Sequence, residues 1–472
     1  MMRKLLALFA AFLALPLLAP GAGLAAENEA AYYSAEDLVF SYDAASAHVV
    51  DLSGQDGYEI TGAGTWVLGG GMRGQLVIRA AKGETVRVVL DNASVTNPDG
   101  PALFAEGAGK VILTLAEGTE NNLSDGEDYD EDEAGGDAAV WVKGDLTVNG
   151  KGALTVRGMA AHGIRSGGVL AVAGGSISVT AVNDGLRGKD GAAILGGALD
   201  IGAGSDGIVS DSGKAGRGWV RVEGGSVVIR ARRDGIQAEG DLSVSGGELD
   251  ITTGGGGREV TFAAAPQEDG GAAQGGMRAE DAPEYAGESA KGLKAKRSVT
   301  VSGGTIMLSS ADDGIHSDGD VTVLGGALTI LSGDDGVHAG GNLRIAGGDV
   351  TVLGSAEGLE ARTVSIEGGT VAIRASEDGV NAASPGFKGD GSAQDGVWVK
   401  VSGGTLRVVA GKDGIDSNGD ITISGGVVDL TVWYPGGGNS AIDPNGVFTH
   451  TGGQVTTSDG SENAAPAPGG RP

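Results

Sequence analysis

The sequence predicts an all-β protein: a right-handed parallel β-helix, a solenoid of about 22-residue coils with three short strands in each coil. Three observations lead to this prediction. Glycine accounts for 91 of the 472 residues, whereas an average chain of this length holds roughly 33. A three-residue unit recurs along much of the chain: the first residue is acidic in most copies, the second is glycine and the third is aliphatic. Between its copies, apolar and polar residues alternate in runs too short for helices.

The period is measured from the glycine that precedes each aliphatic residue. From Gly292 to Gly358 these glycines are 22 residues apart, and longer steps elsewhere carry insertions. A Gly-Gly pair follows each unit at the same period. A fixed period of this size is typical of solenoids. The glycines are Gly163, Gly185, Gly207, Gly235, Gly292, Gly314, Gly336, Gly358, Gly379 and Gly414.

The runs within one coil have the pattern of strands. In DVTV, residues 320–323, Val321 and Val323 point to one face and Thr322 to the other. The run ALTI, after the next Gly-Gly pair, alternates in the same way, and Gly-Ile-His supplies a third strand. Parallel stacking pairs each strand with its copies above and below, and the inward Val, Ile and Leu fill a central column. Glycine allows the tight turns between the strands.

The repeat also divides the chain into segments. Residues 27–160 show a looser period and are predicted to form an N-terminal cap and the first irregular coils, since an open solenoid end is an exposed edge. Residues 161–453 are predicted to form the regular β-helix, with an insertion at residues 253–288. Residues 454–472 are predicted to be a disordered tail.

The first residues predict export. Arg3 and Lys4, an apolar run and small residues follow one another as in a signal peptide, which is assigned to residues 1–26. No other run of about twenty residues is apolar, so no membrane span is predicted. The chain has no cysteine and therefore no disulfide framework. We expect a secreted monomer, either extracellular or periplasmic.

The charge balance is strongly acidic. Sixty-two Asp and Glu residues stand against 33 Lys and Arg, a net charge of −29. Nucleic-acid binding needs a basic surface and is not expected. Carboxylates and carbonyls are the ligands that Ca²⁺ prefers, although most single carboxylates on a surface are simply solvated. The five histidines show no spacing typical of a zinc site.

Four phrases resemble a known family. They are similar to the bacterial carbohydrate-binding β-helix family first described as cellulose- and acid-sugar-binding surface proteins of clostridia, and the likeness runs from about Tyr42 to Gly453. The resemblance implies a calcium-containing β-helix similar in fold to one family of pectate lyases. It implies binding of polygalacturonate-like acidic polysaccharide or cellulose, and it gives no assigned catalysis. The phrases are AEGTENNLSDG (116–126), SAKGLKA (289–295), SADDGIHSDGD (310–320) and DGIDSNGDITISGG (413–426).

The residue after each aliphatic residue points outward, and these residues form the outward row along the solenoid. The outward row is basic or neutral up to His338 and acidic or neutral beyond it. A cationic stripe on an acidic protein could hold a uronate chain, with successive coils meeting successive sugars. A variable solvated row is the alternative. With Lys291 from the neighbouring row, the predicted carbohydrate-binding residues are Arg187, Lys291, Lys294, His316 and His338.

The residue before each glycine forms a second row, the Asp row, which is mostly aspartate. Aspartate before glycine is a common turn residue, because its side chain can bond the turn backbone. Carboxylates stacked about 4.8 Å apart also repel one another, and protonation or a cation relieves the repulsion. Calcium is therefore predicted as the cofactor, in some coils. The predicted metal ligands are Asp184, Asp206, Asp234, Asp313 and Asp335.

Three functions remain open from the sequence. The preferred one is binding of acidic or cellulosic polysaccharide through calcium and cationic side chains. The second is a calcium-assisted lyase, with Lys291 or Lys294 abstracting a proton by β-elimination chemistry. Neighbouring aspartates raise the pKa of a lysine, which disfavours that role, so no catalytic residue is assigned. The third is a structural surface rod or adhesin.

Overall fold

The structure is a computed structural model that describes residues 32–130, 136–261, 287–386 and 392–463. The chain divides into two units, residues 1–34 and residues 35–472. In the first unit, the rings of Tyr32 and Tyr33 meet edge to face, with centroids 5.1 Å apart. The predicted signal peptide lies outside the described residues.

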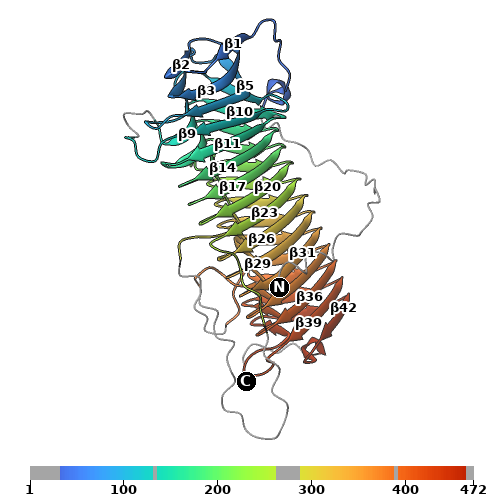
Figure 1. Ribbon diagram of the computed structural model, residues 1–472. Coiled ribbons are helices and arrows are strands. Elements are labelled where there is room, and N and C mark those ends of the chain that lie inside the picture. Colours follow the sequence, from blue (N-terminus) through green and yellow to red (C-terminus); the bar gives the residue numbers. More distant parts are fainter. Residues whose placement is uncertain (1–31, 131–135, 262–286, 387–391, 464–472) are drawn as a thin grey trace. The chain divides into compact units, whose positions relative to one another are not determined.

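The second unit is a parallel β-helix whose strands stack in three columns (Figure 1). Column A contains β2 (Gly57–Ile60), β4 (Gln75–Ile78), β6 (Leu103–Ala105), β9 (Ala138–Val142), β12 (His162–Ser166), β15 (Leu186–Gly188), β18 (Ile208–Ser210), β21 (Ile236–Ala238), β24 (Leu293–Ala295), β27 (Ile315–Ser317), β34 (Val380–Ala382), β37 (Ile415–Ser417) and β40 (Ile442–Pro444). Column B contains β1 (His48–Asp51), β7 (Lys110–Leu115), β10 (Asp145–Gly150), β13 (Val169–Val172), β16 (Gly191–Ile194), β19 (Trp219–Val222), β22 (Asp241–Val244), β25 (Ser298–Val301), β28 (Asp320–Val323), β35 (Trp398–Val401), β38 (Asp420–Ile423) and β41 (Phe448–His450). Column C contains β8 (Glu120–Ser124), β11 (Ala153–Gly158), β14 (Ser176–Ala181), β17 (Ala198–Ala203), β20 (Ser226–Ala231), β23 (Glu248–Thr253), β26 (Thr305–Ser310), β29 (Ala327–Ser332), β31 (Asp349–Ser355), β33 (Thr370–Ala375), β36 (Thr405–Ala410), β39 (Val427–Val432) and β42 (Gln454–Thr457). Longer strands bridge two columns: β30 (Val337–Ile345) and β32 (Leu359–Ile366) join A to B, and β3 (Gly64–Arg73) and β5 (Thr85–Thr96) start in B.

The regular coil agrees with the sequence prediction. Strands β27, β28 and β29 are the three predicted strands of one coil. The strands of neighbouring coils pair in parallel, and the register places His316 opposite His338, which is 22 residues further along the chain. The predicted all-β parallel β-helix is confirmed.

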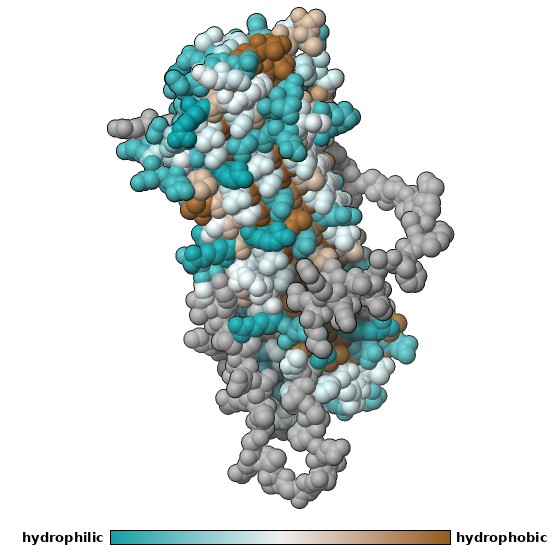
Figure 2. Space-filling view, in the orientation of Figure 1, coloured by the Kyte–Doolittle hydropathy of each residue, from teal (hydrophilic) through white to brown (hydrophobic). Residues whose placement is uncertain are grey.

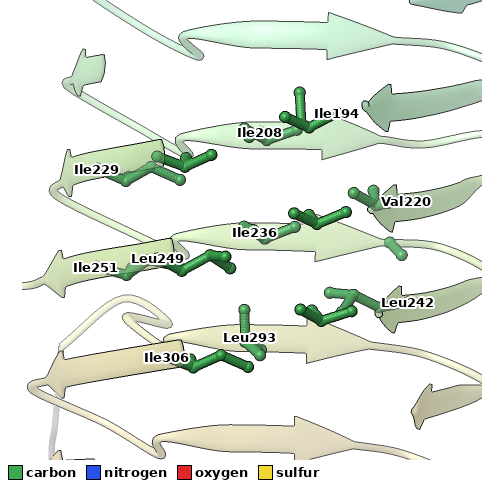
Figure 3. Packing of buried hydrophobic residues seen from close by; sticks show 14 of the residues in the cluster. Ile194, Ile208, Val220, Ile229, Ile236, Leu242, Leu249, Ile251, Leu293 and Ile306 are labelled. Carbon is green, nitrogen blue, oxygen red and sulfur yellow. The ribbon is translucent and has the colours of Figure 1, made fainter. Parts of the chain in front are cut away.

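The inward side chains form one continuous hydrophobic core. Ile208, Ile236 and Leu293 are register partners in successive coils, and each is fully buried (Figure 3). Burying such a side chain contributes about 1.5–3 kcal/mol. Outside, hydrophilic and near-neutral side chains cover most of the face seen in Figure 2, with apolar side chains in small patches and narrow stripes.

Glycine has two different roles in the coil. Gly326, the second residue of a Gly-Gly pair, has φ 94°, as expected for a turn. Gly314, which precedes the aliphatic residue, does not lie in the left-handed region. A Cβ there would sit 2.3 Å from Cγ2 of Ile330 and 2.6 Å from the carbonyl oxygen of Gly336. Close packing of coils, and not a turn, therefore requires the repeated glycine of the acidic-Gly-aliphatic unit.

The N-terminal cap is pinned to column B by a buried carboxylate. Helix η2 (Ala35–Leu38) is a short 3₁₀ turn in which Asp37 is fully buried. The Asp37 carboxylate accepts bonds from Lys110 Nζ at 2.5 Å and Thr147 Oγ1 at 2.7 Å. These contacts tie residues far apart in sequence into the first coils.

The β-helix runs further toward the C-terminus than the sequence analysis predicts. The predicted tail begins at residue 454, but β42 pairs with β39, and the 3₁₀ helix η3 (Ser461–Asn463) follows. The reason is that a Gly-Gly pair precedes β42, as in earlier coils, and Val455 packs against the end of the core. Residues 464–472 lie outside the described residues.

The start of the predicted insertion lies along the outside of column C. Thr253 still belongs to β23. The Gly257 amide then donates to Ser309 Oγ at 3.1 Å, and Arg374 Nε donates to the Val260 carbonyl at 2.9 Å. These bonds fix residues 254–261 across several coils, while residues 262–286 lie outside the described residues. No helix in the described part of the chain is long and apolar enough to cross a membrane.

Candidate functional site

The outward row predicted from the sequence exists on column A. The strand register places Lys294, His316 and His338 opposite one another in successive coils. The row continues through Glu360, Asn381 and Asp416.

The outward row also extends beyond the residues that the sequence analysis found. At its N-terminal end Phe104 is opposite Trp141, and Trp141 is opposite Arg165, whose guanidinium lies 4.5 Å from the indole ring centroid. The sequence analysis placed neither aromatic in the outward row, because no glycine precedes the aliphatic residue in β6 and β9. Their strands, LFA and AAVWV, still carry the aliphatic-then-outward pattern that could have found them.

An open pocket, the acidic hollow, lies beside the outward row where it changes from basic to acidic. Its volume is about 450 Å³. Among the predicted residues, Lys291, His316, His338, Asp313 and Asp335 line it, whereas the other predicted ligands do not. The complete lining is Lys291, Asp313, His316, Asp334, Asp335, His338, Ala356, Glu357, Glu360 and Glu377.

The Asp row forms a hydrogen-bond ladder between coils. Asp206 Oδ1 accepts the amide N–H of Asp234 at 2.9 Å, and Asp234 Oδ1 accepts that of Lys291 at 2.9 Å. Four further aspartates accept the same bond, in each case from the backbone N–H of the residue at the equivalent position in the next coil. They are Asp184, Asp313, Asp378 and Asp413. The aspartates therefore satisfy buried backbone donors, which would otherwise cost about 1–3 kcal/mol each.

The predicted cationic side chains bind the second oxygens of this ladder. Arg187 Nη1 lies 2.6 Å from Asp184 Oδ2, and Lys294 Nζ lies 2.9 Å from Asp234 Oδ2. Burial favours the neutral form of Asp184, but bonds from His162 and Arg187 prevail and lower its pKa to about 2. The predicted cationic stripe is thus a set of internal ion pairs, not a free basic surface.

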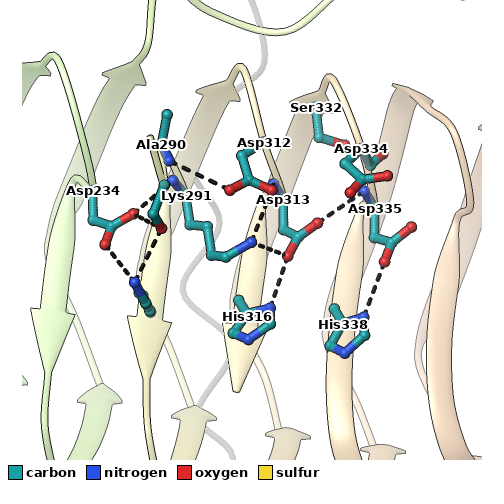
Figure 4. Close-up of polar contacts among 12 residues, drawn as sticks. Asp234, Ala290, Lys291, Asp312, Asp313, His316, Ser332, Asp334, Asp335 and His338 are labelled. Carbon is teal, nitrogen blue, oxygen red and sulfur yellow. Dashed lines mark hydrogen bonds and ion pairs between the residues drawn. The ribbon is translucent and has the colours of Figure 1, made fainter. Parts of the chain in front are cut away.

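Lys291 occupies a pocket of carboxylates (Figure 4). Its Nζ lies 2.6 Å from Asp313 Oδ2 and 2.8 Å from Asp312 Oδ1. Burial opposes the charge, but Asp313 and Asp312 outweigh it and raise the pKa of Lys291. Burial also works against the Asp313 carboxylate, yet His316 and Lys291 lower its pKa to about 2. Lys291 therefore acts as a built-in cation between two coils.

His316 and His338 stand side by side, each next to the aspartate three residues earlier in the sequence (Figure 4). His316 Nδ1 lies 2.7 Å from Asp313 Oδ2. His338 Nδ1 lies 3.0 Å from Asp335 Oδ2 and 2.7 Å from Glu360 Oε2. Burial disfavours the imidazolium of His338, but the bonds to Asp335 and Glu360 raise its pKa to about 10.

Beyond His338 the carboxylates crowd together. Burial, followed by repulsion from Glu360, raises the pKa of Glu357 to about 8. Burial and neighbouring aspartates likewise raise the pKa of Asp413 to about 7 and that of Asp416 to about 8. The repulsion predicted for stacked carboxylates is therefore found in these coils, and it also acts earlier in the Asp row, where burial, followed by repulsion from Asp234 and Asp184, raises the pKa of Asp206 to about 6.

Two groups of described residues have the geometry to hold a metal ion. One is Asp335, His338 and Glu360, and the other is Asp312, Asp313 and Asp334; within each, one ligand atom per residue lies within 4.8 Å of the others. The second group already contains the Lys291 ammonium. The other three predicted metal ligands, Asp184, Asp206 and Asp234, join no such group among the described residues.

Comparisons with known proteins identify the family. A family model described as carbohydrate-binding domain-containing protein matches residues 54–336 and 334–465. No curated protein matches the chain. A solved structure described as a polysaccharide lyase-like protein from C. thermocellum, in a gadolinium derivative, is 30% identical, with a TM-score of 0.43 over 44% of this chain and 92% of that chain. Because the family model spans most of its length, the chain belongs to the family of carbohydrate-binding domain-containing proteins.

Proposed function

We propose that the protein binds polysaccharide along the outward row of column A, and that an acidic sugar chain is held at the acidic hollow through a divalent cation. The observation that carries the proposal is the register that aligns Lys294, His316, His338, Glu360 and Asn381 in successive coils beside that hollow. Repeat proteins use such extended faces for binding. Family membership supports carbohydrate as the class of ligand.

The charges of the acidic hollow decide how an acidic sugar would bind. Carboxyl groups dominate its lining, and Lys291 is already paired with two aspartates. A bare uronate would therefore meet net negative charge. A divalent cation between the uronate and the protein carboxylates turns this repulsion into attraction. Calcium, the cofactor expected from the sequence, would serve this role, and a cellulose chain would need no cation because its hydroxyls can donate to the carboxylates.

The environment of Lys291 argues for binding rather than cleavage. A general base must be available without its proton, and the aspartates around Lys291 raise its pKa. Lys294 is likewise held by Asp234 at 2.9 Å. We therefore expect no unsaturated uronate, the product of β-elimination, when polygalacturonate is incubated with the protein and calcium. Ultraviolet absorbance of that product measures this directly.

Calorimetric titration with polygalacturonate oligomers tests the binding function. We expect saturable heat in the presence of calcium and its loss with a chelator, whereas cello-oligomers should show no calcium dependence. Glu360→Gln should weaken the calcium-dependent binding at least about 10-fold, since Glu360 lines the hollow. The matched control is Glu367→Gln, which removes an exposed carboxylate paired with Arg344.

Each other outcome has a defined meaning. Continuing heat after every injection would indicate turnover and favour the lyase. Equal binding by the Glu360→Gln variant would place the ligand elsewhere on the solenoid. No heat with either polymer would leave a structural rod or adhesin. The proposal includes export of the protein, as the N-terminal sequence predicts.

A further inference from the structure

The same four-residue unit occurs twice beside the acidic hollow, with different surroundings. Asp313-Gly-Ile-His316 and Asp335-Gly-Val-His338 each place a histidine Nδ1 against the aspartate three residues earlier, at 2.7 Å and 3.0 Å. In the first unit, the Lys291 ammonium completes the charge balance. In the second unit no lysine among the described residues takes that place, and the neighbouring coil instead contributes another carboxylate, Glu360, at 2.7 Å from His338 Nδ1.

Asp335 also departs from the ladder that the other aspartates make. Along the described Asp row, the carboxylates of Asp184, Asp206, Asp234, Asp313, Asp378 and Asp413 each accept an amide N–H from the next coil. Among the described coils, the Asp335 carboxylate accepts no backbone N–H, although its side chain is only 8% exposed. Its contacts are with His338 and Glu360, in the hollow. This buried carboxylate therefore does not accept the backbone hydrogen bond that the other aspartates of the row accept, and it is available to bind a ligand.

We propose that Asp335, His338 and Glu360 form a binding site for a first-row transition-metal dication, with Zn²⁺ as its probe. One ligand atom from each residue lies within 4.8 Å of the other two. The ion would replace the proton that His338 Nδ1 now shares with the two carboxylates. His338 and Glu360 are register partners on β30 and β32, so two of the three ligands stand on paired strands and are positioned in advance.

The imidazole determines the class of metal. Calcium takes six to eight oxygen ligands, whereas an imidazole nitrogen with carboxylate oxygens suits zinc and its first-row neighbours. Three protein ligands leave coordination positions open on the side of the hollow, as in metal sites that accept an exogenous ligand. Metal binding does not require polysaccharide, so this inference can fail or hold independently of the proposed function.

Calorimetry with ZnCl₂ alone tests the site on the full chain, after removal of metals with a chelator and in buffer containing excess calcium. We expect one Zn²⁺ per chain, not displaced by calcium, and visible absorption bands when Co²⁺ is substituted. His338→Gln and Glu360→Gln should each lower the Zn²⁺ affinity at least about 10-fold. The Glu360 side chain is 28% exposed and takes no part in the ladder, so the Glu360→Gln variant tests the site even if His338→Gln disturbs folding.

His316→Gln is the matched control, because His316 stacks on His338 but lies outside the three ligands. It should bind Zn²⁺ as the unaltered protein does. The inference is overturned if Zn²⁺ shows no saturable binding, if calcium displaces it, or if the Glu360→Gln variant binds it with unchanged affinity. A sugar titration in calcium without zinc reports separately on the proposed function.

Discussion

The imidazole rings of His316 and His338 stack in parallel, with centroids 4.8 Å apart and planes inclined by 9°. This separation is the spacing between neighbouring strands of a sheet, so the side chains repeat the geometry of the backbone. The two rings nevertheless have different charged surroundings. The Asp313 carboxylate that His316 contacts also pairs with Lys291, whereas His338 contacts a second carboxylate, that of Glu360. Neighbouring coils of similar sequence can therefore have different chemistry.

The Asp ladder should be a main source of stability. Asp234 is fully buried, accepts the Lys291 amide and pairs with Lys294. We expect Asp234→Ala to lower the free energy of unfolding by about 2–4 kcal/mol, since it strands a backbone donor and a partly buried ammonium. Asp234→Asn should lower the free energy of unfolding by less, because the asparagine side-chain oxygen can still accept the backbone N–H of Lys291. Denaturant unfolding measures both variants.

The control for the ladder is Asp200→Ala, which removes an exposed ion pair with Arg230 on column C. Surface pairs of this kind contribute little, so its unfolding should match that of the unaltered protein. Equal losses for Asp234→Ala and Asp200→Ala would contradict a structural role for the Asp row.

Lys291 should stabilise the fold by neutralising buried aspartates. Lys291→Met leaves the carboxylates of Asp312 and Asp313 without their ammonium, and we expect a loss of about 3–5 kcal/mol in the free energy of unfolding. The same substitution at Lys296, an exposed residue paired with Glu239, should change little. Thermal unfolding of both variants tests this prediction. An unchanged unfolding midpoint for Lys291→Met would show that Lys291 does not stabilise the fold.

Acidic pH should relieve the repulsion near the C-terminal coils. Burial, followed by the neighbouring Asp378, Asp413 and Asp443, raises the pKa of Asp416 from 3.8 to about 8. Because the folded pKa is raised, its stabilising contribution is fully present below about pH 3.8 and is lost as the pH rises through about 8. We expect Asp416→Asn to raise the free energy of unfolding by about 1–3 kcal/mol at pH 9 and to change it little at pH 4.

Unfolding in chelator at the two pH values tests this prediction without interference from metal. Asp429→Asn, at an exposed position of column C, is the control and should show no such difference. An Asp416→Asn variant with the same effect at both pH values would show that ionisation is not the cause.

The repeated glycine before each aliphatic residue should tolerate no side chain. Gly314→Ala would place a methyl group 2.3 Å from Ile330 Cγ2 and 2.6 Å from a carbonyl oxygen. Overpacking of this kind costs about 1–3 kcal/mol. Gly71→Ala should be tolerated, since a methyl group there would have no neighbouring atom within 4 Å. Comparison of the two melting temperatures checks this, and a neutral Gly314→Ala would contradict the packing role.

Much of the fold can be predicted from the local sequence, because in a solenoid the repeat length determines which residues stack on one another. The 22-residue step fixes which residues stack, so the outward row and the Asp row follow from the sequence without the structure. The last coil was not predicted, since the step that leads to it is longer than 22 residues. Phe104 and Trp141 were not placed in the outward row, because their coils lack the glycine that marks the repeat.

The sequence by itself determined the β-helix and its two rows, because each depends only on alternation and period. The tertiary structure decided what those residues do. In the folded protein, the expected sugar-binding cations form ion pairs with the Asp row, and most aspartates of that row accept hydrogen bonds from backbone amides. Asp335 instead contacts His338 and Glu360. The physical reason is that charge balance depends on which oxygen and nitrogen atoms meet between coils, and period alone does not specify those contacts.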